Sequence, residues 1–169
     1  MAGRLVSDIN AKSATALTQL ARQLDGMDPH LDSASTRGEW TTREVLAHLL
    51  GDPGWDPLAA LKTFAHRDLP TIDVTVGKVV MTAERRTMTA KQFLDAIERR
   101  RQKIVAYLGT LPEGELTGRK ARIPFFKQFM GTDEVPLHVY AGALLDNHWN
   151  DHAGQLGKIR TANGLPEAP

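Results

Sequence analysis

The sequence contains no cysteine, which excludes disulfides, a thiolate nucleophile and cysteine-ligated zinc or iron–sulfur sites. Aromatic residues make up only 6% of the 169 residues, and no apolar run reaches the ~18 residues of a membrane-spanning helix. Residues 1–10 also lack the apolar core of a signal peptide, so we expect a cytoplasmic protein without a membrane partner. A formal net charge of +1 gives no basic footprint, so no nucleic-acid partner is expected either.

The residues that are present indicate a globular helical domain. The composition, 41% hydrophobic and 24% charged, is ordinary for such a protein, and a chain of this length can bury a real core. Apolar residues recur at helical spacing in four segments, which are separated by glycine and proline. Repeats and low-complexity tracts are absent from the sequence. We therefore predict one domain over 1–169 with an all-α, four-helix-bundle fold.

The first half of the chain predicts two of the helices. The first is expected over 7–24, where glycine and proline end it. The second begins at a capping box, in which the Thr41 hydroxyl and the Glu44 carboxylate each accept a hydrogen bond from the other residue's backbone N–H. Glycine and proline at 51–54 interrupt this helix, and a bent or restarted helix is expected over 56–66.

The second half predicts the other two helices and two connections. Residues 69–86 contain a β-leaning patch, which predicts an excursion of extended chain between the second and third helices, with one hairpin as an option. A second capping box opens the third helix at 89–109. Residues 113–131 predict a loop rich in glycine and basic residues, and the fourth helix is expected over 135–159.

Two of the six histidines, His148 and His152, are four residues apart in the fourth helix. At this spacing both side chains lie on one face, about 6 Å apart, so both imidazoles can reach one ion. Both also fall on the apolar line of that helix, which runs through Leu137, Ala141, Leu145, Leu156 and Ile159. Histidine pairs at this spacing also arise by chance, so packed or surface histidines are the alternative.

Helix geometry limits which histidine can join this pair. His138 lies about 15 Å from His148 along the axis and roughly 80° around it, and His66 would lie at least ~27 Å beyond His48 on a continuous helix. His48 falls on an inner face of the second helix, which leaves His48, His148 and His152 as the favoured set. Three neutral imidazoles suit Zn, Ni, Fe or Co better than Mg or Ca, and they leave a coordination position open.

Two segments resemble the signature motifs of the DinB-like superfamily. They are Gly-Glu-Trp-Thr-Thr-Arg-Glu-Val-Leu-Ala-His-Leu at 38–49 and His-Trp-Asn-Asp-His-Ala-Gly-Gln-Leu at 148–156. The group includes damage-inducible DinB proteins, YfiT-type proteins, thiol-dependent S-transferases and the mycothiol-dependent maleylpyruvate isomerase. The resemblance covers nearly the whole chain. It implies an up-up-down-down-type bundle whose metal ligands are His48, His148 and His152.

The same resemblance implies two classes of function. The first is a metal-dependent enzyme of S-transferase, isomerase or hydrolase type that uses a low-molecular-weight thiol, with Zn²⁺ or Ni²⁺ lowering the pKa of a bound thiol or water. The second is a non-catalytic, stress-related bundle that binds a metal or a small ligand. A small-molecule substrate is the expected partner, and a homodimer is compatible because members of the family commonly pair.

Four polar residues are candidates for roles beside the metal. Asp52 lies one turn after His48 on the same face, where we expect it to orient His48 or a bound water. Arg101 falls on the apolar line of the third helix, where it either snorkels to the bundle edge or faces the pocket and holds a substrate carboxylate. Asp151 is expected on the surface, and Gln155 is a weaker candidate for a polar contact with the site.

Aromatic residues separate the two functional hypotheses. An open polar pocket faced by Arg101 would favour the enzyme, whereas an apolar lid would favour the binding protein. The lid would consist of Trp55, Phe125, Phe126 and Trp149. Considered singly, these residues are expected to pack, with Phe129 in the core and Trp40 stapled onto Val45. Of the arginines at 99–101, only Arg101 is expected to turn inward.

Overall fold

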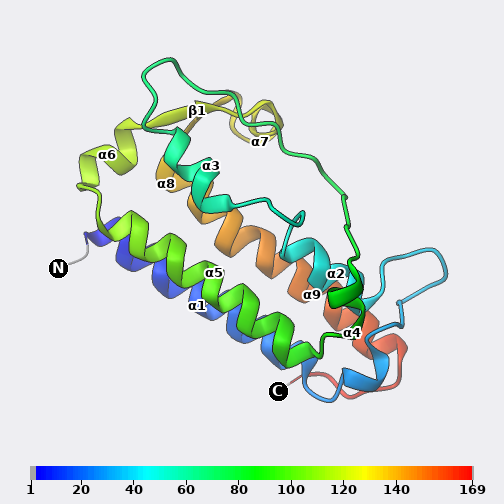
Figure 1. Cartoon of the computed structure of the whole chain (residues 1–169). Coiled ribbons are helices and arrows are strands. Elements are labelled where there is room, and N and C mark those ends of the chain that lie inside the picture. Colours follow the sequence, from blue (N-terminus) through cyan, green and yellow to red (C-terminus); the bar gives the residue numbers. More distant parts are fainter. Residues whose placement is uncertain (1–2, 169) are drawn as a thin grey trace.

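The computed structural model describes residues 3–168, and in it four helical rods lie side by side (Figure 1). The first rod is α1 (Arg4–Leu24), the second is α2 (Thr42–Leu49) with α3 (Pro57–Thr63), the third is α5 (Ala90–Gly109), and the fourth is α8 (Leu137–Gly142), the π-helical turn η3 (Ala143–Asn147) and α9 (His148–Ala162). The expected all-α four-helix bundle is confirmed.

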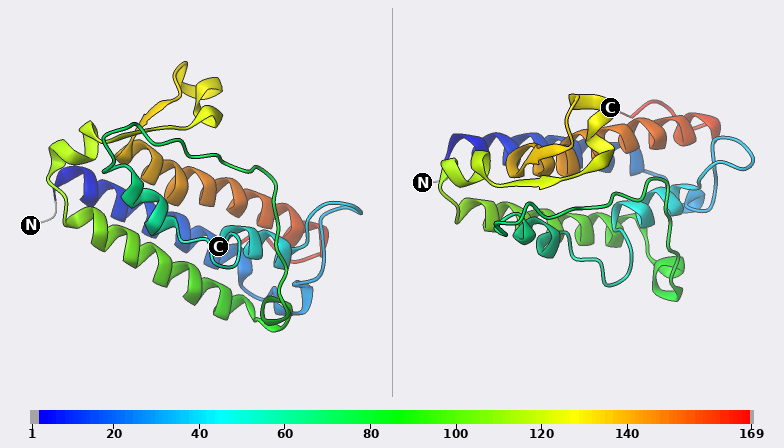
Figure 2. Two further views of the ribbon diagram at one scale, coloured as in Figure 1. Left: turned by 45° about the horizontal axis from the view of Figure 1, so that its top comes forward. Right: turned by 90° about the horizontal axis from the view of Figure 1, so that it is seen from above.

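The rods form two layers, with α1 beside α8–α9 and α5 beside α2–α3 (Figure 2). α1 packs against both α9 and α5, and α2 also packs against both of them. Two rods run in each direction, and their order along the chain is up, down, down, up, which differs from the up-up-down-down order that the resemblance implies (Figure 1). Because α2 and α9 are neighbours, side chains from the second and fourth rods can meet.

Both expected capping boxes are present. The Thr41 hydroxyl accepts from the Glu44 N–H at 3.2 Å, and the Glu44 carboxylate accepts from the Thr41 N–H at 2.8 Å. Thr89 and Gln92 make the same exchange at the start of α5. Each box satisfies N–H groups that the first turn of a helix leaves free. The first box therefore fixes where α2 begins, and with it the turn on which His48 lies.

The core fills the space between the rods. Leu20, Leu46, Phe93, Ile97 and Leu156, which come from all four rods, are each at most 1% exposed. Burying a side chain of this size contributes about 1.5–3 kcal/mol. Within residues 3–168, no helix is both long enough and apolar enough to span a bilayer.

The fourth rod changes its winding just before the histidine pair. In η3, the His148 N–H donates to the Ala143 carbonyl, five residues back instead of four. On a regular α-helix, residues spaced by four would drift about 40° per step. The wider turn instead keeps a line spaced by four on the buried side, through Leu137, Ala141, Leu145, Trp149 and Ala153.

The prediction of a plain loop at 113–131 is wrong. The segment contains α6 (Glu113–Gly118), β1 (Lys120–Arg122), the 3-10 turn η2 (Pro124–Phe126) and α7 (Lys127–Met130), and β1 pairs with the antiparallel strand β2 (Glu134–Pro136). The fourth rod therefore begins at Leu137, after β2. Ala121 and Val135 face each other across this two-stranded ribbon of β1 and β2, and both are fully buried. Each strand is too short for its alternation of buried and exposed residues to predict a strand from sequence.

α7 stands away from the rods, on the yellow arm of Figure 2. Phe129, which lies on it, is 68% exposed, so its expected place in the core is wrong. Phe125 and Phe126 are half-buried and pack against the core, where the Phe126 ring lies 6.2 Å from that of Tyr140. Two of the three expected core phenylalanines of this segment therefore pack, and the third faces solvent.

Residues 69–82, which we call the strap, run as extended chain from α3 towards the short helix α4 (Ala83–Thr87), as expected. The optional hairpin is wrong: the strap pairs instead with β1, through a parallel bridge between Thr71 and Arg122. Val74 and Val76 are 37% and 69% exposed, so these β-favouring side chains face solvent. The strap runs back along the second rod, from the end of α3 to α4 beside α2 (Figure 1).

Candidate metal centre

The three predicted ligands meet between α2 and α9. His48 lies in the last turn of α2, His148 is the first residue of α9, and His152 follows one turn later. The Nε2 atom of His148 is 2.9 Å from that of His48 and 3.1 Å from that of His152. All three residues are half-buried, and their ligand atoms lie within 4.8 Å of one another. Residues 100 positions apart in the chain thus converge on a space suited to one ion.

The outer ring nitrogens of His48 and His152 are bonded to acceptors. His48 Nδ1 lies 2.8 Å from the carbonyl oxygen of Lys78, and His152 Nδ1 lies 2.8 Å from Gln155 Oε1. These oxygens only accept, so each Nδ1 carries the proton and each Nε2 keeps its lone pair. The expected polar contact of Gln155 with the site is confirmed.

His148 is the middle member of the triad. Its Nε2 faces the Nε2 atoms of the other two histidines. Burial, followed by the charges of His152 and His48, lowers the pKa of His148 from 6.5 to about 3. Burial also lowers the pKa of His152. Both rings are therefore neutral at pH 7, which is the form that binds metals.

The donor set fits a tetrahedral divalent ion. Zn–N bonds of about 2.0–2.1 Å at tetrahedral angles place ligand nitrogens about 3.3 Å apart, close to the 2.9 and 3.1 Å observed here. Three converging lone pairs repel one another, and a cation between them relieves this repulsion. Mg²⁺ and Ca²⁺ prefer oxygen ligands, so the site suits a transition metal or zinc.

Trp40 lies against two of the ligands. Its ring is stacked on His152, with centroids 6.1 Å apart and planes inclined by 14°, and its centroid is 4.9 Å from that of His48. The sequence-based assignment of Trp40 to a staple on Val45 missed this contact. The sequence did contain a signal for this contact. Trp40 directly precedes the capping box that fixes the start of α2, and so its position relative to His48 is fixed by the same turn.

Asp52 reaches His48 through the strap. Its Oδ2 lies 2.5 Å from Lys78 Nζ, and the carbonyl of the same lysine accepts the Nδ1 proton of His48. Sequence spacing predicted that Asp52 orients His48 or a bound water, with Asp52 one turn after His48 on the same helix; α2 instead ends at Leu49. The structure inserts Lys78 between them, a residue that lies 30 positions from His48 and was not a candidate.

Arg101 contacts other partners. Its guanidinium pairs with Glu98 at 2.6 Å and donates to the side chain of Asn10 on α1 at 2.7 Å. These contacts match the packing alternative, and the role of Arg101 toward a substrate stays a prediction. His138 lies outside the triad, as expected, with Nδ1 3.0 Å from the Leu116 carbonyl.

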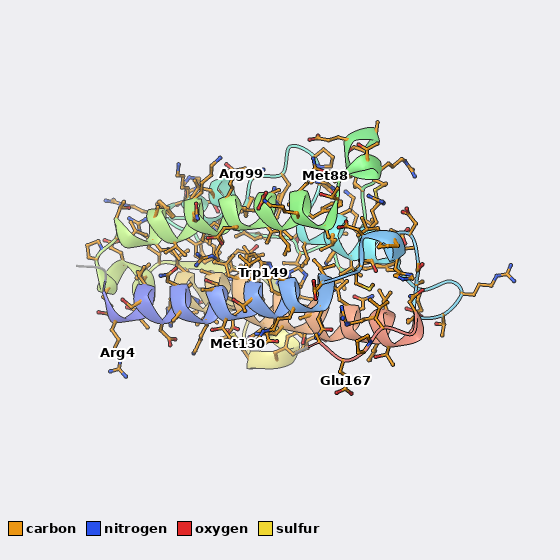
Figure 3. The ribbon with its side chains drawn as sticks, turned by 90° about the horizontal axis from the view of Figure 1, so that it is seen from below. Arg4, Met88, Arg99, Met130, Trp149 and Glu167 are labelled. Carbon is orange, nitrogen blue, oxygen red and sulfur yellow. The ribbon has the colours of Figure 1, made fainter. Side chains whose placement is uncertain are left out.

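Two predictions, for the arginines at 99–101 and for the aromatic lid, differ from the structure. Arg100 also turns inward: it donates to the Leu50 carbonyl and its guanidinium lies 5.5 Å from the centre of the Trp55 ring. Arg99 points to solvent, whereas Trp149 lies inside the bundle beside α1 (Figure 3). Because Trp149 is 3% exposed in the core, it does not belong to a lid over the site.

Acid is expected to destabilise the metal-free protein through His148. Since folding lowers the pKa of His148 from 6.5 to about 3, the unfolded chain binds more protons than the folded chain between these values. This contribution to stability is fully present above pH 6.5 and is lost as the pH falls towards 3. Urea unfolding of chelator-treated protein between about pH 7.5 and 4.5 measures the loss.

His148→Gln is the control for this pH dependence, because it removes the titrating ring and keeps a polar side chain. Other groups, including the ion-paired Asp32 and Glu98, titrate in both proteins. The variant should therefore lose less stability than the wild type over the same range. Equal losses would contradict the assignment to His148.

No protein-family model matches the chain, and no curated protein matches it. Among solved structures it is similar to YfiT from Bacillus subtilis, which is described as "a probable metal-dependent hydrolase with an unusual four-helix bundle topology". The TM-score is 0.70 and the sequence identity 17%, over 98% of this chain and 91% of YfiT. The chain therefore has the four-helix-bundle fold of YfiT, as the DinB-like resemblance of 38–49 and 148–156 predicts.

Proposed function

We propose that this protein binds one divalent metal ion, Zn²⁺ or Ni²⁺, through the Nε2 atoms of His48, His148 and His152, and that it is a metal-dependent enzyme acting on a small molecule. The observation that carries the proposal is the direction in which the ring nitrogens point. The outer nitrogens of His48 and His152 are bonded to protein acceptors, and the inner nitrogens of all three histidines converge. Outward hydrogen bonds of this kind are typical of metal-binding histidines.

An ion held by three protein ligands keeps a position for water or substrate and supplies a Lewis acid that lowers the pKa of a bound water or thiol. The chain itself orients the three rings and shields His152 on one side with Trp40. The description of YfiT as a probable hydrolase favours water as the nucleophile. The resemblance to thiol-dependent DinB-like proteins favours a low-molecular-weight thiol, which must come from a co-substrate because the chain has no cysteine.

A non-catalytic protein that binds a metal or small ligand is the second candidate. It is favoured by the contacts of Arg101, because the cation expected to hold an acidic substrate is paired with Glu98 and bonded to Asn10. Both candidates use the same three ligands. They differ in whether the open coordination position turns over a substrate.

Metal analysis tests the shared part of the proposal. Protein purified without a histidine tag should contain about one equivalent of Zn or Ni by ICP-MS, because three neutral imidazoles form one site. His48→Ala, purified in parallel, should have lost the metal. Metal-free wild type, or metal that survives the substitution, would overturn the site.

Activity assays then separate the two candidates. Ester and amide substrates test hydrolysis, and a thiol with an electrophile tests S-transfer. An activity that a chelator removes and the metal restores would support the enzyme. Turnover unaffected by the chelator would contradict metal dependence, and a loaded protein inactive on both panels would favour the binding protein.

A further inference from the structure

Two buried arginines tie the strap and α4 to α2 through backbone carbonyls. Arg85, on α4, is 8% exposed, and its Nη1 donates to the carbonyls of Val80 at 2.7 Å and Ala47 at 3.3 Å. Arg43, on α2, is 9% exposed, and its Nη1 donates to the carbonyls of Met88 at 2.7 Å and Arg85 at 3.2 Å. Arg85 of α4 thus donates to a carbonyl of α2, and Arg43 of α2 donates to carbonyls in α4 and directly after it.

Arg85 joins the two segments that meet at the outer nitrogen of His48. Ala47 directly precedes His48 on α2. Val80 lies two residues after Lys78, whose carbonyl accepts the Nδ1 proton of His48 at 2.8 Å. The Arg85 guanidinium therefore bonds to both chain segments that form this hydrogen bond. Its contact on α2 is one residue from His48, and its contact on the strap is two residues from Lys78.

Burial makes this link stronger than the ion pair between Lys78 of the strap and Asp52, which follows α2. A buried guanidinium must keep its hydrogen bonds, because leaving a buried charge unpaired is costly, and bonds to a charged donor are stronger than neutral ones. The Asp52–Lys78 pair, by contrast, has side chains that are 40% and 51% exposed. Exposed pairs of this kind contribute little and are screened by salt.

We propose that Arg85 is a positioning residue for His48. By docking the strap onto α2, it keeps the Lys78 carbonyl against Nδ1, which fixes the proton on that nitrogen and leaves Nε2 free to bind the metal. The consequence for metal affinity rests on the proposed function, whereas the consequence for the ring tautomer does not. Outer partners of metal-binding histidines typically account for a factor of about 10–100 in affinity.

Arg85→Met keeps much of the side-chain volume and removes the donors. It is expected to weaken Zn²⁺ binding about 10- to 100-fold, measured by competition with a chromophoric chelator. Asp52→Asn breaks only the exposed pair and should weaken binding at most about fivefold, and less at high salt.

Arg160→Met is the matched control. Arg160 is 5% exposed and, like Arg85, donates to backbone carbonyls, here those of Gln23, Asp25 and Pro166. It lies eight residues beyond His152, about 12 Å along the helix axis. Its loss should lower the melting temperature and leave Zn²⁺ affinity unchanged.

The tautomer of His48 gives a readout that does not require metal. In zinc-free wild type at about pH 8, where imidazole is neutral, long-range ¹H–¹⁵N NMR should find the Nδ1-protonated form. In Arg85→Met, the Nε2-protonated form should gain population. Arg85→Lys keeps the charge with less reach and should give an intermediate result, and it replaces Arg85→Met if that variant does not fold.

Wild-type tautomer and wild-type Zn²⁺ affinity in the Arg85 variants, together with a loss of stability like that of Arg160→Met, would overturn the proposal. If the wild type binds no Zn²⁺, the proposed function fails. The tautomer measurement then still decides the role of Arg85.

Discussion

His148→Ala is expected to weaken Zn²⁺ binding about a thousandfold. Both short Nε2–Nε2 distances, 2.9 and 3.1 Å, involve His148, so its removal leaves two ligands without the one that lies between them. Zinc bound to small protein sites contributes about 10–16 kcal/mol. Shared among three ligands, this is about 4 kcal/mol each, or about three powers of ten in Kd. Zn²⁺ titration of the metal-free variant measures the change.

His138→Ala is the control for this substitution. His138 is on the same rod, is also half-buried, and also bonds a backbone carbonyl, that of Leu116 at 3.0 Å. It should therefore reproduce the structural cost of removing a packed histidine while Zn²⁺ affinity stays at the wild-type value. An equal loss of affinity in both variants would indicate that the rod, and not the ligand, was damaged.

Trp149→Ala is expected to cost about 3–5 kcal/mol of stability, the usual range for a large buried aromatic. Trp149 stands between the two helical ligands in sequence, but each residue turns the helix by about 100°, so its ring points into the bundle at 3% exposure. For a chain of this size, about 1 kcal/mol shifts Tm by about 2–4 °C. The melting temperature should fall by about 6–20 °C.

Phe129→Ala is the comparison, since Phe129 is 68% exposed and its removal should leave Tm nearly unchanged. Below its melting temperature, folded Trp149→Ala should bind Zn²⁺ with near wild-type affinity, because Trp149 belongs to the core. A normal Tm with altered Zn²⁺ binding would place Trp149 over the metal and would contradict this assignment.

Local signals in the sequence determined where α2 and α5 begin and which histidines face inward. The capping boxes at Thr41 and Thr89 are satisfied within one turn of chain, so no distant residue is needed to form them. The pair His148 and His152 follows from helical spacing alone. His48 could be added because it falls on an inner face of the second helix, whereas His138 and His66 were too distant along their helices.

The ribbon and the strap were decided by tertiary contacts. β1 and β2 are each three residues long, too short for a periodic pattern, and they form because Ala121 and Val135 are buried against each other. The strap is β-favouring in composition, yet its one bridge is to β1 at Arg122. Pairing partners far away in the chain leave no mark on local sequence.

The support of the site was also decided by the tertiary structure. The sequence by itself determined the helical segments, the starts of α2 and α5 and the pair His148 and His152, because these follow from signals within single helices. Only the packed chain brought Lys78 to His48, Trp40 over His152 and Arg85 between α2 and the strap. The Lys78 and Arg85 contacts depend on backbone carbonyls. Every residue carries a backbone carbonyl, so these contacts cannot be predicted from residue type.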